Sequence, residues 1–138
     1  MNIEYENTKE FNEDELQNLF LSVEWLSGRY PEKLKVAMRN SDTVLSAWHE
    51  GQLVGLINAL DDGILTAYIH YLLVHPSFQK QGVGKELVLR IREIYKDYLR
   101  IVLICDKKEI PFYQNCGFEV GENTTPMFIN TKMFINSD

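Results

Sequence analysis

Cysteine is scarce in this chain of 138 residues, and the scarcity excludes a fold held together by several disulfides. The two cysteines, Cys105 and Cys116, each lie in a short apolar run, and neither belongs to a Cys-x-x-Cys pair. Such cysteines are typically reduced thiols in a protein core. We therefore expect two free, buried thiols.

Basic residues are also few, since 14 Lys and Arg face 20 Asp and Glu and leave a net charge of −6. This balance argues against a nucleic-acid-binding face and mildly favours a small cationic substrate. No stretch approaches the roughly 18 consecutive apolar residues of a membrane span, and the N-terminus lacks the pattern of a signal peptide. No repeat or flexible linker divides the sequence. We expect one domain over residues 1–138, cytoplasmic, bound neither to membrane nor to nucleic acid.

The first half of the sequence predicts a short strand, two helices and three further strands. Apolar residues at helical spacing place one helix from about Glu13, and Pro31 suits the first turn of a second. Strand patterns cover residues 3–5, 43–49, 53–60 and 64–74. Glycine-bearing turns at residues 50–52 and 61–63 join the last three strands into an antiparallel meander.

The pattern changes after Pro76. A helix is predicted from Lys85 to about Tyr98, and its buried stripe is formed by Leu87, Val88, Ile91 and Ile94. An all-apolar strand over residues 100–105 follows, and its composition suits burial on both faces. A short helix over residues 110–115 and strands near residues 118–120 and 127–135 come last.

A strand, a crossover helix and a second strand require a parallel pair, which places residues 64–74 beside residues 100–105. The predicted fold is therefore α/β, with a single-domain mixed sheet, antiparallel arms at both ends, a parallel pair at the centre, and about four helices.

A glycine-bearing turn at residues 79–85 joins the predicted strand to the long helix. Backbone N–H groups at a helix N-terminus have no intrahelical acceptor, and Gly82 and Gly84 would let a pyrophosphate approach them closely. Gln79 and Glu86 exclude a Walker A loop, and Leu87 excludes a dinucleotide-binding fingerprint. The alternative is that these glycines only form a tight turn.

The segment from Leu72 to Gly84 resembles motif A of the GNAT superfamily of acetyl-CoA-dependent N-acetyltransferases, in which a Gln or Arg precedes Gly-x-Gly or Gly-x-Ala. Gln79, Gly82 and Gly84 meet that pattern. Residues 111–118 resemble motif B, in which a Tyr precedes a Gly-Phe pair. The order of predicted elements matches the family over nearly the whole chain.

The resemblance implies that the parallel strands splay apart and that acetyl-CoA lies between them. Main-chain groups of one strand would pair with pantetheine, and amides of the turn would hold the pyrophosphate. Asp106 replaces an Asn that many family members use for the cofactor arm, and a carboxylate accepts hydrogen bonds but does not donate them as an amide does. The implied cofactor-binding residues are Leu72, Leu73, Val74, Gln79, Lys80, Gln81, Gly82, Val83, Gly84, Lys85 and Asp106.

The resemblance also implies a proton donor, because Tyr113 matches the acid residue at the start of motif B. A phenol with a pKa near 10 suits the protonation of a departing thiolate. The Val74 N–H would polarise the thioester carbonyl. The alternative for Tyr113 is a core residue with its hydroxyl at the rim.

His70 is the predicted base, because its position resembles the catalytic His of the arylalkylamine N-acetyltransferase branch. Without a bulge, Tyr68, His70, Leu72 and Val74 would alternate onto one strand face. Glu24 or water is the alternative base.

The acceptor site is expected between the first two helices and the strand that carries His70. Trp25 and Tyr30 would hold the apolar part of an amine or stack on a cation, unless both are core aromatics. The leading hypothesis is direct acetyl transfer from acetyl-CoA to a primary amine of a small molecule, without a metal. A protein N-acetyltransferase and a non-catalytic acyl-CoA-binding module are the alternatives, and a homodimer is a further hypothesis.

Overall fold

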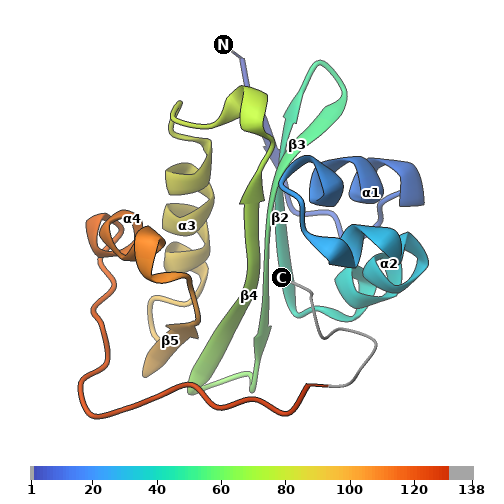
Figure 1. Ribbon diagram of the computed structural model, residues 1–138. Coiled ribbons are helices and arrows are strands. Elements are labelled where there is room, and N and C mark those ends of the chain that lie inside the picture. The colour runs from blue at the N-terminus through green and yellow to red at the C-terminus, as the bar shows by residue number, and fades with distance from the viewer. Residues whose placement is uncertain (1, 131–138) are drawn as a thin grey trace.

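The computed structural model describes residues 2–130 as a five-stranded sheet with helices on both faces (Figure 1). The strands are β1 (Glu4–Glu6), β2 (Thr43–His49), β3 (Gln52–Asp61), β4 (Thr66–Val74) and β5 (Arg100–Leu103). The α-helices are α1 (Glu13–Ser22), α2 (Pro31–Asn40), α3 (Val83–Ile94) and α4 (Ile110–Asn115). Short 3-10 helices are η1 (Leu26–Arg29), η2 (Pro76–Phe78) and η3 (Lys107–Glu109). Within residues 2–130 no helix is long and apolar enough to cross a membrane.

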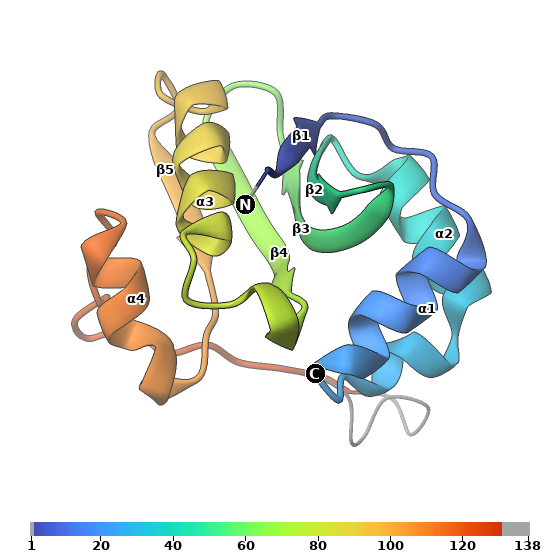
Figure 2. The ribbon, with the colours of Figure 1, turned by 90° about the horizontal axis from the view of Figure 1, so that it is seen from above.

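The strands follow one another across the sheet in chain order. The pairs from β1 to β4 are antiparallel, whereas β4 and β5 are parallel and are joined through α3. Seen from above, α3 and α4 lie on one side of the sheet and α1 and α2 on the other (Figure 2). The predicted α/β fold with a mixed sheet and four helices is confirmed.

Each face of the sheet carries its own hydrophobic core. The α3 side includes Ala67, Ile69, Leu87 and Ile91, and the α1 and α2 side includes Leu16, Phe20, Met38, Leu56 and Leu73. Strand β4 contributes to both cores, so its side chains connect the two halves of the molecule.

Helix α1 begins at Glu13, as predicted, and the structure shows a capping box at its start. The Asn12 side chain accepts a hydrogen bond from the Glu15 amide at 2.8 Å, and the Glu15 carboxylate accepts one from the Asn12 amide at 3.0 Å. Helix α2 begins at Pro31. Proline has no backbone N–H, but no helical hydrogen bond is lost, because an N–H in the first turn has no intrahelical acceptor. Both predicted helix starts are confirmed.

Helix α3 starts earlier and ends sooner than predicted. It begins at Val83 rather than Lys85, and it ends at Ile94 rather than near Tyr98. Ile94 is 50% exposed, so its place in the buried stripe was wrong; Tyr95 is only 2% exposed and takes that place. The Tyr95 hydroxyl donates to the Asp61 carboxylate at 2.7 Å, which fixes the helix end against the sheet.

Strand β4 starts later than predicted because Asp62 organises the preceding turn. Its carboxylate Oδ1 accepts hydrogen bonds from the amides of Ile64, Leu65 and Thr66 at 2.7 to 3.1 Å. These bonds hold Ile64 and Leu65 in the turn, where both side chains are exposed.

The C-terminal part of the predicted sheet is not formed in the described residues. Residues 118–120 and 127–130 are not strands, and residues 131–135 of that prediction lie outside the described part. Residues 119–130 are exposed and run across the lower front of the sheet from α4 (Figures 1 and 2). Strand β5 therefore lies at the sheet edge within residues 2–130, and its predicted burial on both faces is wrong; Val102 is 37% exposed.

Candidate active site

Strand β4 extends beyond its pairing with β5, and the splaying of the two strands stays a prediction. Their parallel ladder runs from Thr66 opposite Arg100 to Ile69 opposite Leu103 and stops there. Strand β4 continues to Val74 while paired only with β3. Within residues 2–130, the side of β4 that faces away from β3 has no strand partner after Ile69, and the space between it and the residues that follow Leu103 is called the gap here.

Main-chain groups of β4 face this gap. The His75 amide donates to the Val54 carbonyl of β3 at 2.8 Å. Because residues of an antiparallel strand alternate, Leu73 also directs its N–H and C=O to β3, whereas Leu72 and Val74 direct theirs to the gap. The Val74 carbonyl accepts the Gln79 side-chain amide at 2.9 Å. This geometry favours Leu72 and the Val74 N–H over Leu73 as partners for an extended ligand.

The glycine turn lies at the mouth of the gap and opens α3. Gly82 has φ +86° and is the N-cap residue, so an L side chain there would be strained. The Glu86 amide bonds to the Gly82 carbonyl at 2.9 Å, which leaves the amides of Val83, Gly84 and Lys85 without an intrahelical acceptor.

The two predicted motifs meet at Gly84. A Cβ on this residue would lie 3.4 Å from the Phe112 ring of α4 and 3.6 Å from the Val74 side chain. The turn, β4 and α4 are thus in direct contact around one point. Lys80 and Gln81 are exposed beside the turn, and the Gln81 amide donates to the Ser77 carbonyl at 3.4 Å.

Tyr113 lies half-buried on α4 between two aromatic rings, with Phe112 at 5.0 Å and Phe118 at 5.9 Å between centroids. Burial raises the pKa of its hydroxyl well above the ordinary value, and the nearby Cys105, Glu109 and Cys116 raise it further. The phenol therefore keeps its proton at neutral pH, which is the state a proton donor requires.

The residues that follow β5 form the other side of the gap. Asp106 is exposed at the start of η3, and its carbonyl accepts the Glu109 amide at 2.9 Å. Both cysteines are free thiols, as predicted, but only Cys116 is buried; Cys105 is half-buried, so its predicted burial is wrong. Burial raises the pKa of the Cys105 thiol, so this group stays protonated beside Tyr113.

His70 does not share a strand face with Leu72 and Val74, because β4 contains the kind of bulge whose absence the predicted alternation required. Asn58 of β3 stands opposite both His70 and Tyr71, because Ile57 pairs with Leu72 and Ala59 pairs with Ile69. This bulge reverses the phase of the strand. Leu72 and Val74 pack toward α3, whereas Tyr71 packs in the core of α1 and α2.

His70 is exposed on the α1 and α2 side, where it stacks on Tyr71 with 4.0 Å between ring centroids. Tyr68 stacks on the other side of His70 at 5.8 Å. The imidazole is therefore held in a row of three aromatic rings at the start of the gap.

Tyr71 is the residue that sequence reasoning missed. Its ring packs against Phe20 at 5.0 Å and Trp25 at 5.8 Å, and its hydroxyl lies 3.2 Å from the Ser27 hydroxyl. Strict alternation would place Tyr71 and His70 on opposite faces of the sheet. The sequence therefore did not indicate that they are neighbours, which results from the bulge. The predicted acceptor residue Trp25 belongs to this cluster, and Glu24 is exposed just before it.

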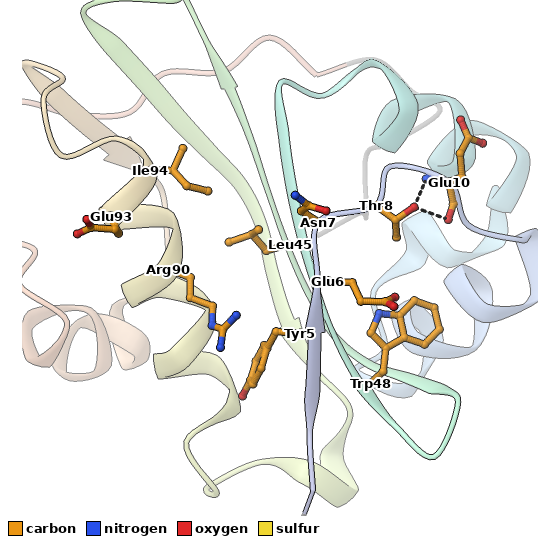
Figure 3. A pocket seen from close by; sticks show the side chains of 10 residues that line it. All are labelled: Tyr5, Glu6, Asn7, Thr8, Glu10, Leu45, Trp48, Arg90, Glu93 and Ile94. Carbon is orange, nitrogen blue, oxygen red and sulfur yellow. Dashed lines mark hydrogen bonds between the residues drawn. The ribbon is translucent and has the colours of Figure 1, made fainter.

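A separate hollow of about 840 Å³ lies between β1 and α3 (Figure 3). None of the predicted site residues lines it. Its Arg90 lies 4.3 Å from the centroid of the Tyr5 ring and donates to the Glu86 carboxylate at 2.7 Å, so its charge is already matched. Among residues 2–130, no group of three His, Cys, Asp or Glu side chains is placed to hold a metal ion.

Known proteins share both the sequence and the fold. GCN5-related N-acetyltransferase 3, chloroplastic, of Arabidopsis thaliana is 45% identical over 83 residues, or 56% of this chain and 35% of that protein. The uncharacterized N-acetyltransferase ycf52 of Gracilaria tenuistipitata var. liui is 34% identical over 78% of this chain and 62% of that protein. A GNAT family acetyltransferase from Streptococcus pneumoniae TIGR4 superposes with a TM-score of 0.82 at 25% identity, covering 95% of this chain and 99% of that one.

The chain thus spans 35% and 62% of the lengths of these two curated relatives. The family model for the acetyltransferase (GNAT) family matches residues 8–118, which include the glycine turn, both strands of the gap and α4. The resemblance of the two motifs is confirmed, and the chain belongs to the acetyltransferase (GNAT) family.

Proposed function

We propose that this protein transfers the acetyl group of acetyl-CoA to a primary amine of a small molecule. The observation that carries the proposal is the gap between β4 and β5, which opens beside the unpaired amides at the head of α3. An extended chain bearing amides fits the first feature, and a pyrophosphate fits the second.

The described residues fit acetyl-CoA at both ends of the site. The main chain of Leu72 and the Val74 N–H would pair with the pantetheine amides, and the amides of Val83, Gly84 and Lys85 would hold the pyrophosphate. Gln79 is hydrogen-bonded to the Val74 carbonyl, and we propose that Lys80, Gln81, Gly82 and Asp106 also contact the cofactor.

When bound, acetyl-CoA supplies a thioester carbonyl that an amine can attack. The Val74 N–H is directed into the gap and would stabilise negative charge on that oxygen. The Tyr113 hydroxyl holds a proton on the α4 side and would pass it to the departing sulfur.

On the opposite side of the sheet, His70 is the proposed base. Its imidazole would accept a proton from the ammonium form of the acceptor through water, because only the neutral amine attacks. Trp25 and Tyr71 would contact the apolar part of the acceptor. The net charge of −6 supports a cationic acceptor.

The proposal is tested by mixing the purified chain with acetyl-CoA and a panel of small primary amines, then following the release of free thiol. We expect release that depends on an amine, together with an acetylated product identified by mass spectrometry. Release with a lysine-bearing peptide alone would assign the acceptor to proteins. Calorimetric binding of CoA without release would indicate a binding module, and no CoA binding would overturn the proposal.

A further inference from the structure

A polar side chain lies in the middle of the most buried strand. Residues 53–59 of β3 are all buried, and Asn58 is the only one with a polar side chain, at 1% exposure. A buried amide destabilises a core unless its donors and acceptors are matched. Asn58 therefore requires a structural or functional reason.

Asn58 is hydrogen-bonded on both sides. Its Nδ2 donates to the Ser41 hydroxyl at 3.0 Å, and that hydroxyl donates to the Ala37 carbonyl of α2 at 2.8 Å. Its Oδ1 accepts the Tyr71 backbone amide at 2.9 Å. The side chain thus connects the end of α2 to the bulge in β4.

The bond to Tyr71 compensates for the bulge. An extra residue in a strand loses its place in the ladder, and an unpaired backbone N–H away from water is destabilising. Asn58 stands opposite His70 and Tyr71 and supplies the acceptor that the ladder lacks.

Two features of the site begin at this bulge. The parallel ladder with β5 ends at Ile69, immediately before it, so the gap opens here. The bulge also brings His70 and Tyr71 onto the same face, 4.0 Å apart. Without the bulge, alternation would place the two rings on opposite faces of the sheet.

We propose that Asn58 is a positioning residue, which holds the β4 bulge through the Tyr71 amide and so sets both the gap and the His70–Tyr71 pair. This inference rests on the proposed function, because it assigns Asn58 a role in acetyl transfer through His70, Tyr71 and the gap. Asn58 itself is buried and touches no reacting atom.

The test compares Asn58→Leu, which removes the acceptor for the Tyr71 amide, with Ser41→Ala, which removes the other partner of Asn58 and spares that acceptor. Amide hydrogen exchange at Tyr71, CoA affinity and the separate values of kcat and KM are measured. In Asn58→Leu we expect exchange at Tyr71 to accelerate about tenfold or more, and kcat and CoA affinity to fall by a similar factor. In Ser41→Ala all three should stay within about twofold of the wild type.

If Asn58→Leu does not fold, Asn58→Asp keeps Oδ1 and is expected to preserve slow exchange at Tyr71. Unchanged exchange, CoA affinity and kcat in folded Asn58→Leu would overturn the inference, as would fast Tyr71 exchange in the wild type. Exchange needs no acetyl-CoA and no acceptor. A wild-type chain that does not bind CoA but loses Tyr71 protection in Asn58→Leu would overturn the proposed function while retaining Asn58 as the residue that holds the bulge.

Discussion

At the scale of the residue, the site uses side chains whose protonation and orientation are set by their surroundings. Tyr113 keeps its proton because it is half-buried among aromatic rings. His70 is oriented by the rings of Tyr68 and Tyr71, and Tyr71 is in turn fixed by Asn58. The proposed acid, Tyr113, is therefore partly enclosed, whereas the proposed base, His70, is exposed. Such a difference in environment suits opposite roles in proton transfer.

Replacing Tyr113 by Phe should lower turnover about a hundredfold, because the variant loses the proton donor while keeping the ring that packs on Phe112. CoA affinity should stay within about twofold, since the hydroxyl contributes to proton transfer more than to binding. Thiol release and calorimetry measure the two quantities. The control is Tyr5→Phe, remote from the gap beneath Arg90, which should change neither. Equal losses in both variants would contradict the assignment.

Alkaline pH should destabilise the fold through its tyrosines, of which Tyr95 and Tyr113 have the most strongly raised pKa values. Burial raises the pKa of Tyr113, and burial together with Asp61 raises the pKa of Tyr95. A group whose pKa is higher in the folded state contributes its full stability below its unfolded pKa, about 10 for tyrosine, and loses it as the pH rises through the folded pKa. The free energy of unfolding should therefore fall above about pH 10.

Urea denaturation across neutral and alkaline pH measures this dependence. Tyr113→Phe should lose less stability than the wild type at alkaline pH, because one of the groups with a strongly raised pKa is gone. A free energy of unfolding that rises in this range would refute the assignment of the buried phenols.

At the scale of the element, the site is built where secondary structure ends or is interrupted. The pairing of β4 with β5 ends immediately before the β4 bulge, and the N-terminus of α3 supplies unpaired amides beside the gap. Regular strands and helices satisfy their own backbone groups, so only such irregular points leave donors and acceptors for a ligand.

Gly82→Ala should weaken CoA binding about tenfold, because a residue with φ +86° is strained with a side chain and the N-terminal amides of α3 would move. Stability should fall by about 1–2 kcal/mol. Gly51→Ala is the matched control, since Gly51 has φ +80° in a hairpin away from the gap. The Gly51→Ala variant should lose a similar amount of stability but keep its CoA affinity. Calorimetric titration with CoA therefore distinguishes the two variants. A Gly82→Ala variant with wild-type affinity would exclude the turn from the binding site.

At the scale of the whole molecule, the sheet separates two functions. One face packs α3 and α4, which carry the proposed cofactor contacts, and the other packs α1 and α2, which carry the proposed acceptor contacts (Figure 2). We propose that the gap at β4 connects the faces, so that a cofactor bound from one side would present its acetyl group to an acceptor bound from the other.

CoA should stabilise the folded chain by mass action. At a free CoA concentration of about 100 times Kd, the gain is about 2.7 kcal/mol, which raises Tm by roughly 8 °C for a domain of this size. Differential scanning calorimetry measures the shift. Pantetheine, which lacks the pyrophosphate, and ADP, which lacks the arm, should each give a smaller shift. A shift with ADP as large as that with CoA would exclude the gap as the site of the arm.

Much of the molecule follows from local sequence signals. The helical spacing of apolar residues after Glu13, Pro31 at the start of α2 and the glycines of the hairpins predict element starts and turns, because these effects act within a few residues. The two motifs predict the family and the place of the glycine turn for the same reason. The strand pattern near residues 118–120 predicts a strand that the described structure lacks, since a strand forms only where a partner completes its hydrogen bonds.

Sequence by itself therefore determined the α/β class, the parallel crossover and the residue types of the site. Tertiary structure decided which way β4 faces at each residue, because the bulge opposite Asn58 depends on a buried hydrogen bond from another strand. It also decided that His70 neighbours Tyr71 rather than Leu72. The hydrophobic periodicity of a sequence does not reveal where a strand holds one extra residue. The position of that residue is set by the packing of the two cores against β4.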